Sequence, residues 1–171
     1  MQRMYEGRVL ALDTGRHRFP NGTEHDVTIV RHRPSVVLVP VLDDGRVLLV
    51  RQYRPSVERY LWELPAGSTD PNEAPEAAAV RECAEETRQV PGHVQRIGGF
   101  YPAPGFCDEE LIFFRVSRLT PIGADSTFTP DADEDIEVRP FALAEARAMV
   151  ANGEIVDLKT AYGLTLEPPR R

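Results

Sequence analysis

Short runs of apolar residues separated by turn residues predict β-strands in the first part of the chain. Three such runs, each rich in valine, are Val27–Val30, Val36–Leu42 and Val47–Val50. Asp44-Gly45, between the second and third runs, is a dipeptide typical of a tight hairpin turn. A further short strand is expected over Leu61–Pro65, and Pro65-Ala66-Gly67 is expected to turn the chain after it.

The pattern then changes to that of a helix. Ala74–Arg88 is rich in alanine and glutamate, and Pro75 is compatible with a helix because it falls in the first turn, where its missing N–H would bond nothing. Later segments predict strands over Val94–Phe100, Leu111–Val116 and near Ile136–Phe141, and helices over Ala142–Ala151 and Val156–Leu166. This order of elements, without a long linker, indicates one mixed α/β domain over residues 1–171.

Charge and composition exclude several kinds of function. The chain has 171 residues and a formal net charge of −7, so an extended contact with a nucleic-acid backbone, which requires a basic surface, is not expected. No stretch approaches the roughly 18 consecutive apolar residues of a membrane helix, and neither secretion nor membrane insertion is expected. Cys83 and Cys107 form neither a metal-binding spacing nor a disulfide framework, which favours a cytoplasmic location.

Three glutamates gather on one face of the predicted helix. At about 100° per residue, Glu82, Glu85 and Glu86 lie within an arc of roughly 100°, opposite Val80 and Cys83. Carboxylates this close repel one another, so a cation is expected beside them. Ligands that are all oxygen favour Mg²⁺ or Mn²⁺ over zinc. Taken alone, however, the glutamates also fit an acidic helix face exposed to water.

The spacing around these glutamates carries a family resemblance. Gly67 is followed after five residues by Glu73, and after seven more by Arg81-Glu82-Cys83-Ala84-Glu85-Glu86. This spacing resembles the Nudix box, and the chain is identified as a member of the Nudix hydrolase family. The resemblance implies a Nudix-type α/β/α sandwich with a mixed β-sheet. It also implies a short N-terminal β region, at about residues 1–34, before a catalytic core over residues 35–166.

The end of the box departs from the family pattern. Arg88 stands where the box has a glycine at the helix C-terminus, and Gln89 replaces an apolar residue. A left-handed conformation at Arg88 would cost roughly 1 kcal/mol, unless the helix continues to Pro91-Gly92. The departure therefore concerns the end of the helix rather than the chemistry.

The resemblance implies hydrolysis of a nucleoside diphosphate linked to another group, with a divalent cation as cofactor. By position, Glu82 and Glu86 would bind Mg²⁺ or Mn²⁺, together with the backbone carbonyl of Ala66. Glu85 would be a third ligand or the acid that orients water. The cation would offset the charge of the diphosphate and acidify the attacking water.

Two further residues are expected to complete the catalytic site. Arg81 would pair with Glu73 or Glu85 and fix the carboxylate geometry. Glu134, in the acidic loop Asp131–Asp135, is the candidate for a general base or an extra metal ligand, because several relatives carry a loop glutamate in this region. A solvated acidic loop is the alternative interpretation of this segment.

Segments outside the box are similar to the ADP-ribose pyrophosphatase subgroup. They are Val50–Pro55, Leu61–Gly67 and Tyr101–Glu109. Arg51 and Arg54 suit bidentate contacts to phosphate, and the third segment offers Gly105, Phe106 and Glu109 for binding the substrate. The resemblance implies cleavage of ADP-ribose to AMP and ribose 5-phosphate by a homodimer that exchanges its N-terminal strands.

Two departures leave the substrate open. Ala103 replaces the serine that the subgroup commonly carries before Pro-Gly, while Asp26 and Thr28 stand where relatives often place Arg and Glu to hold adenine. Hydrolysis of another nucleoside diphosphate sugar, such as GDP-mannose, is one alternative. A nucleotide-sensing Nudix module with little activity is another, although the intact set of acids favours the enzyme.

Overall fold

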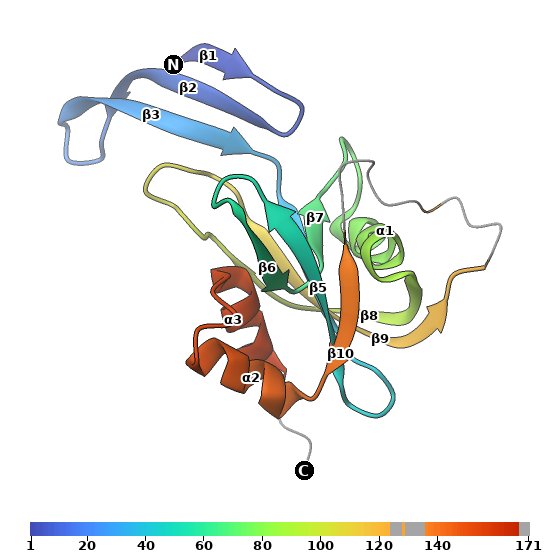
Figure 1. Ribbon diagram of the computed structural model, residues 1–171. Helices are drawn as coiled ribbons and strands as arrows, with labels where there is room; N and C mark the ends of the chain where they lie inside the picture. Colours follow the sequence, from blue (N-terminus) through green and yellow to red (C-terminus); the bar gives the residue numbers. More distant parts are fainter. Residues whose placement is uncertain (124–127, 129–135, 168–171) are drawn as a thin grey trace.

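The computed structural model describes residues 1–123, 128 and 136–167 (Figure 1). The strands are β1 (Gln2–Glu6), β2 (Leu10–Arg18), β3 (Glu24–His32), β4 (Ser35–Pro40), β5 (Val47–Arg54), β6 (Arg59–Glu63), β7 (Ala66–Ser68), β8 (Gln89–Phe100), β9 (Leu111–Pro121) and β10 (Glu137–Phe141). The helices are α1 (Pro75–Thr87), α2 (Leu143–Ala151) and α3 (Leu158–Leu166). Within the described residues, none of the helices combines the length and apolar character needed to span a lipid bilayer.

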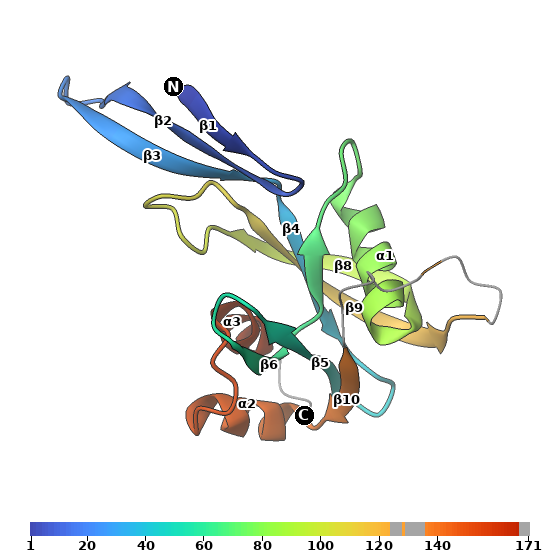
Figure 2. The ribbon, with the colours of Figure 1, turned by 45° about the horizontal axis from the view of Figure 1, so that its top comes forward.

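The strands form three sheets. A mixed sheet has the order β7-β4-β9-β8, with β4 and β9 parallel, and an antiparallel sheet has the order β10-β5-β6. The third sheet, β1-β2-β3, is antiparallel and projects from the rest of the molecule (Figure 2). The predicted α/β fold with N-terminal strands is therefore confirmed, with the core strands divided between two sheets.

Strand β4 is the centre of the fold because both of its faces are buried. Its side chains alternate in direction, as in any strand. Val36 and Leu38 pack with Ala79 of α1, whereas Val37 and Val39 pack with apolar residues of α2 and α3. Helix α1 thus covers one side of the mixed sheet and the two C-terminal helices lie on the other, which is the expected α/β/α arrangement (Figure 1).

The N-terminal sheet is only partly visible in the sequence. The pattern predicts a strand at Val27–Val30, inside β3, but it does not mark β1 or β2. All five residues of β1 are exposed, so β1 lacks the alternating apolar positions that identify a half-buried strand. The sheet joins the core at Val30, whose backbone N–H donates to the carbonyl of Phe106 (2.7 Å).

Two local features differ from simple expectation around the acidic helix. The segment expected to turn at Pro65-Ala66-Gly67 continues into β7, which pairs with β4. Helix α1 ends at Thr87, and Arg88 adopts the left-handed conformation, with φ 58° and ψ 28°. Its N–H donates to the carbonyl of Ala84 (3.1 Å), so the helix does not continue to Pro91-Gly92.

The left-handed Arg88 predicts a difference between two substitutions. Both Arg88→Gly and Arg88→Ala remove the hydrogen bond from Arg88 Nη1 to the carbonyl of Phe128 (2.8 Å), but only glycine removes the backbone strain. We expect Arg88→Gly to be more stable than Arg88→Ala by about 1 kcal/mol in urea unfolding. Equal stability of the two variants would show that Arg88 is not strained.

Candidate active site

A cavity of about 680 Å³ lies where β7, α1, the start of α3 and the end of the N-terminal sheet meet. It is lined by Arg8, Val9, His32, Arg33, Ser35, Arg54, Ala66, Gly67, Ser68, Asp70, Arg81, Glu82, Glu85, Pro102, Glu109, Leu111, Asp157, Leu158 and Lys159. Its volume is typical of a site for a small molecule. Acidic and basic side chains both contribute to the lining, so the cavity can hold a ligand that carries negative charge together with a cation.

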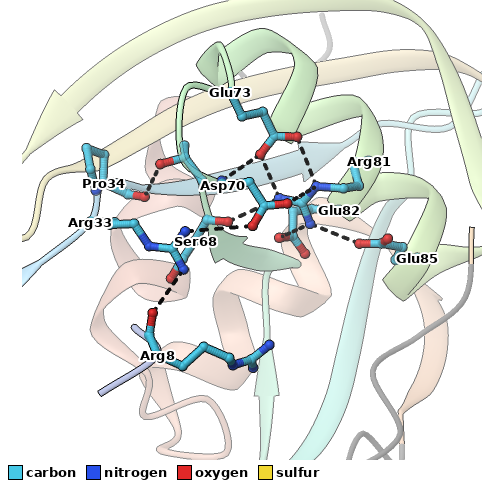
Figure 3. A network of polar contacts seen from close by, with 10 residues as sticks. Arg8, Arg33, Pro34, Ser68, Asp70, Glu73, Arg81, Glu82 and Glu85 are labelled. Atoms are coloured by element: carbon cyan, nitrogen blue, oxygen red, sulfur yellow. Dashed lines mark hydrogen bonds and ion pairs between the residues drawn. The ribbon is translucent and has the colours of Figure 1, made fainter. Parts of the chain in front are cut away.

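Arg81 organises the acidic part of the cavity (Figure 3). Its Nε and Nη2 donate to the two oxygens of Glu73, both at 2.9 Å. Its Nη1 donates to Glu82 (2.7 Å) and Glu85 (3.0 Å), and Nη2 also donates to the carbonyl of Ser68 (3.1 Å). Arg81 therefore pairs with both Glu73 and Glu85, the two alternative partners that the sequence suggested.

These contacts change the protonation of the pair. The hydrogen bonds from Arg81 lower the pKa of Glu73, and the Glu73 carboxylate raises the pKa of Arg81 above its ordinary value. Both side chains are therefore charged at neutral pH, and Arg81 stays a fixed cation beside the acids of α1.

Glu82 lies directly against the backbone of Gly67. A Cβ atom placed on Gly67 would come within 2.1 Å of the Glu82 carboxylate carbon. Glycine is therefore required here by close approach rather than by an unusual backbone angle. Glu82 is only 8% exposed, and its carboxylate is fixed between β7 and Arg81.

Glu86 lies behind the cavity lining. It is 3% exposed, and its Oε2 accepts a hydrogen bond from the backbone N–H of Ala66 (3.2 Å). The contact fixes the Pro65–Ala66 peptide, one peptide before the Ala66 carbonyl that the Nudix resemblance makes a metal ligand. The ligand role of Glu86 stays a prediction.

The acids of α1 fit a divalent cation by their chemistry. Glu82, Glu85 and Glu86 offer only carboxylate oxygens, which are the donors that Mg²⁺ and Mn²⁺ prefer. Among the residues that the structure describes, no three acidic, histidine or cysteine side chains converge closely enough to share one ion. In this arrangement Glu82 and Glu85 are both hydrogen-bonded to Arg81.

A second ion-pair network forms another part of the cavity wall. Glu63 is 1% exposed and accepts two hydrogen bonds from Arg54, at 2.7 and 2.6 Å. Lys159 also donates to Glu63, and to Asp157 (3.0 Å) at the start of α3. Burial alone would raise the pKa of Glu63, but the contacts with Arg54 and Lys159 outweigh it and lower the pKa. Arg54 is thus held by the protein where it lines the cavity.

Glu109 is also placed at the cavity. Its Oε1 accepts a hydrogen bond from Ser35 Oγ (2.7 Å) and lies 3.5 Å from His32 Nδ1. The preceding Asp108 accepts from the backbone N–H of His32 (2.8 Å) and from Arg31 (2.9 Å). These contacts attach the loop between β8 and β9 to the end of the N-terminal sheet.

Some predicted residues are not part of the lining. Arg51 points to the opposite face of β5 from the site, with its guanidinium over the Tyr60 ring at 4.8 Å. Gly105 and Phe106 also lie outside the lining, and the Phe106 side chain is exposed. Glu134 lies outside the described residues. The roles of these four residues stay predictions.

The cavity also contains residues that the sequence analysis did not assign to the site. Arg8, Arg33 and Lys159 are the cations among them. They come from three distant parts of the chain, and no motif connects them. The one feature of the sequence that sets any of these cations apart is that Lys159 is its single lysine.

Comparison with known proteins identifies a family and close relatives. The NUDIX domain family matches residues 31–159. The chain is 34% identical over 163 residues to the ADP-ribose pyrophosphatase of Bacillus subtilis (strain 168), covering 95% of this chain and 87% of the relative. It is also 34% identical over 155 residues to the ADP-ribose pyrophosphatase of Mycobacterium tuberculosis (strain ATCC 25618 / H37Rv), covering 90% of this chain and 74% of the relative.

A solved structure supports the fold. The crystal structure of an ADP compounds hydrolase superimposes with a TM-score of 0.79 and 22% sequence identity, covering 96% of this chain and 88% of that one. The match extends over nearly the whole chain, so it includes the N-terminal strands as well as the core.

The close approach of Gly67 and Glu82 predicts the effect of one added methyl group. In Gly67→Ala, the new Cβ must displace the Glu82 carboxylate. We expect Mn²⁺ affinity, measured by electron paramagnetic resonance, to fall about 10- to 100-fold, as when the support of a metal ligand is removed. Gly123→Ala is the control, since a Cβ there meets nothing within 4 Å. Unchanged Mn²⁺ affinity in Gly67→Ala would contradict a ligand role for Glu82 in this position.

Proposed function

This chain belongs to the NUDIX domain family, and we propose that it hydrolyses the pyrophosphate bond of ADP-ribose to give AMP and ribose 5-phosphate. The observation that carries the proposal is the placement of Arg81, Glu82 and Glu85 around one cavity, with Arg81 bonded to both acids. The near full-length similarity to two ADP-ribose pyrophosphatases supports this substrate.

The cofactor in this proposal is Mg²⁺ or Mn²⁺, with Glu82, Glu85, Glu86 and the carbonyl of Ala66 as its ligands. Because no three such side chains among the described residues lie close enough to share one ion, binding requires the carboxylates to shift toward the metal. When bound, a divalent cation supplies positive charge beside the diphosphate and makes water more acidic. Two contacts support a cation beside β7: Gly67 lets Glu82 lie against this strand, and Glu86 accepts a hydrogen bond from the backbone N–H of Ala66.

The reaction needs a water molecule aligned with one phosphorus atom. The water oxygen forms a bond to phosphorus, the bridging P–O bond breaks, and the proton released by water passes to a carboxylate base. We assign the orientation of the water to Glu85, whose carboxylate Arg81 holds at the cavity wall. Glu134 is the proposed base, on the family resemblance of its loop.

The rest of the cavity suits the remainder of the substrate. Glu109 offers a carboxylate that can accept hydrogen bonds from ribose hydroxyls, and Ser35 holds it in place. Arg54 contributes positive charge, and Glu63 keeps its guanidinium at the wall. Arg51, Gly105 and Phe106 were also proposed from the sequence to bind the substrate, but none of them lines this cavity, and Arg51 faces away from it.

We further propose that the protein is a homodimer formed through its N-terminal sheet. This sheet projects from the molecule (Figure 2). Its Met4 and Tyr5 side chains are exposed. A proposed cytoplasmic location is supported by the free thiols of Cys83 and Cys107, since a reducing compartment keeps cysteines unpaired.

The substrate proposal is tested with ADP-ribose, GDP-mannose and NADH, each with Mg²⁺ and with EDTA, and with products identified by chromatography. We expect ADP-ribose to be hydrolysed fastest, to AMP and ribose 5-phosphate, and only with the metal. Faster hydrolysis of GDP-mannose would support metal-dependent pyrophosphate hydrolysis but contradict ADP-ribose as the preferred substrate. Binding without product would favour the nucleotide-sensing alternative.

The same assay tests the role of Glu86. We expect Glu86→Gln to lower turnover at least about 100-fold, because removing one group that stabilises the developing charge has effects of this size. Glu76→Gln is the matched control, since Glu76 is an exposed glutamate in the first turn of the same helix. Circular dichroism checks that both variants stay folded. Equal turnover of the two variants would remove Glu86 from the site.

The dimer proposal is tested by light scattering, with twice the 19.2 kDa of one chain as the expected mass. Tyr5→Glu places a charge in the exposed sheet, where the side chain is 57% exposed, and we expect it to shift the protein towards monomer. Tyr101→Glu is the control, because Tyr101 is 60% exposed but lies outside that sheet. A wild-type monomer, or an equal shift in both variants, would contradict the proposal.

A further inference from the structure

Arg33 is a cavity residue whose hydrogen bonding is incomplete. It follows β3 directly and precedes Pro34, so its backbone position is set by two strands and a proline. In the described part of the chain, its Nε is the buried side-chain nitrogen for which no hydrogen-bond partner is found. A buried donor without a partner destabilises a protein, and such a group calls for an explanation.

The other contacts of the Arg33 guanidinium are long. Its Nη2 donates to the carbonyl of Arg8 at 3.4 Å, and its Nη1 lies 3.7 Å from a carboxylate oxygen of Asp70. Arg81 makes contacts of 2.7 to 3.1 Å with its partners. Figure 3 shows Arg33 and Arg81 on different sides of Asp70. The protein therefore holds Arg33 far less firmly than it holds Arg81.

Other cations of the cavity have stronger protein contacts than Arg33. Arg54 uses Nε and Nη2 to bind the two oxygens of buried Glu63. Lys159 donates to Glu63 and to Asp157. Arg33 differs from both, because it lines the same cavity with a buried N–H that no acceptor among the described residues reaches.

We propose that Arg33 binds an oxygen of the substrate diphosphate, an inference that rests on the proposed function. The diphosphate is the anionic part of ADP-ribose, and a guanidinium presents its donors in a planar fork that matches phosphate oxygens. Arg33 also lies near the acids of α1, since Asp70 stands 3.7 Å from Arg33 and 4.0 Å from Arg81. An oxygen of a diphosphate bound between Arg33 and helix α1 would contact the Arg33 guanidinium. The acids of α1 would hold the divalent cation on the other side of the diphosphate.

Three variants test the proposal. Arg33→Met removes the guanidinium and keeps an unbranched side chain, and Arg33→Lys keeps the charge without the Nε–H. Arg96→Met is the matched control, because Arg96 is 54% exposed, lies outside the cavity lining and has a weak 3.4 Å contact with Glu110. Calorimetry with ADP-ribose in EDTA measures binding without turnover, adenosine serves as the probe that lacks a diphosphate, and kinetics with Mg²⁺ give kcat and KM.

Arg33→Met is expected to have opposite effects on binding and stability. The Kd for ADP-ribose should rise roughly 10- to 100-fold, which is the range for a lost hydrogen bond to a charged group, while binding of adenosine is unchanged. The Tm of the ligand-free protein should rise by a few degrees, because the variant no longer buries an unpartnered N–H. Arg33→Lys should bind ADP-ribose with intermediate affinity, and Arg96→Met like the wild type.

Other results would overturn the proposal. An unchanged Kd for ADP-ribose in Arg33→Met would show that Arg33 does not bind the diphosphate. A lower Tm with weaker binding of adenosine as well would show that Arg33 has a structural role. If the wild-type protein fails to hydrolyse ADP-ribose, the proposed function fails instead. The binding comparison is then made with GDP-mannose, which also carries a diphosphate.

Discussion

The acids of helix α1 can lie side by side because Arg81 uses every one of its N–H donors on the groups around it. A guanidinium has five such donors, and Arg81 makes five hydrogen bonds, to Glu73, Glu82, Glu85 and the carbonyl of Ser68. These bonds offset the repulsion between carboxylates on one helix face and connect α1 to β7 and to the loop before the helix. Without Arg81, Glu82 and Glu85 would lose the shared donor that offsets their repulsion.

The position of α1 depends in turn on the packing below it. The helix presents small side chains, Ala78, Ala79 and Cys83, to the mixed sheet, and all three are fully buried. Small residues let the helix axis approach the sheet, and this brings Glu82 against the backbone of Gly67. Burial raises the pKa of the Cys83 thiol to about 11, which leaves it uncharged and suits a packing role. The spacing of the Nudix box therefore reflects how α1 packs on the mixed sheet as well as where the acidic residues lie.

The parts of the site that could be predicted from the sequence are those whose residues are close along the chain. The helix and its acidic face follow from spacings within one element, and the pairing of Arg81 with Glu73 follows from a spacing of eight residues. Arg51 and Arg54 suit phosphate equally well by residue type, but strand alternation places only Arg54 at the cavity. Glu63 and Lys159 are 96 positions apart, and no local pattern connects them. Their contact depends on where α3 lies against the sheets, which only the tertiary structure shows.

In a chain with a single lysine, an arginine is the candidate for structural and for binding roles alike, and residue type does not distinguish the two. The number of N–H donors that are already hydrogen-bonded within the protein does distinguish them. An arginine such as Arg81, with every N–H bonded inside the protein, would lose those bonds if it turned to a ligand, so it serves to fix the geometry of other groups. Arg33 loses little by turning to a phosphate oxygen, because among the described residues its Nε has no partner and its nearest carboxylate is 3.7 Å away. A net charge of −7 repels a diphosphate at long range, so binding must come from a few local cations whose donors are still available.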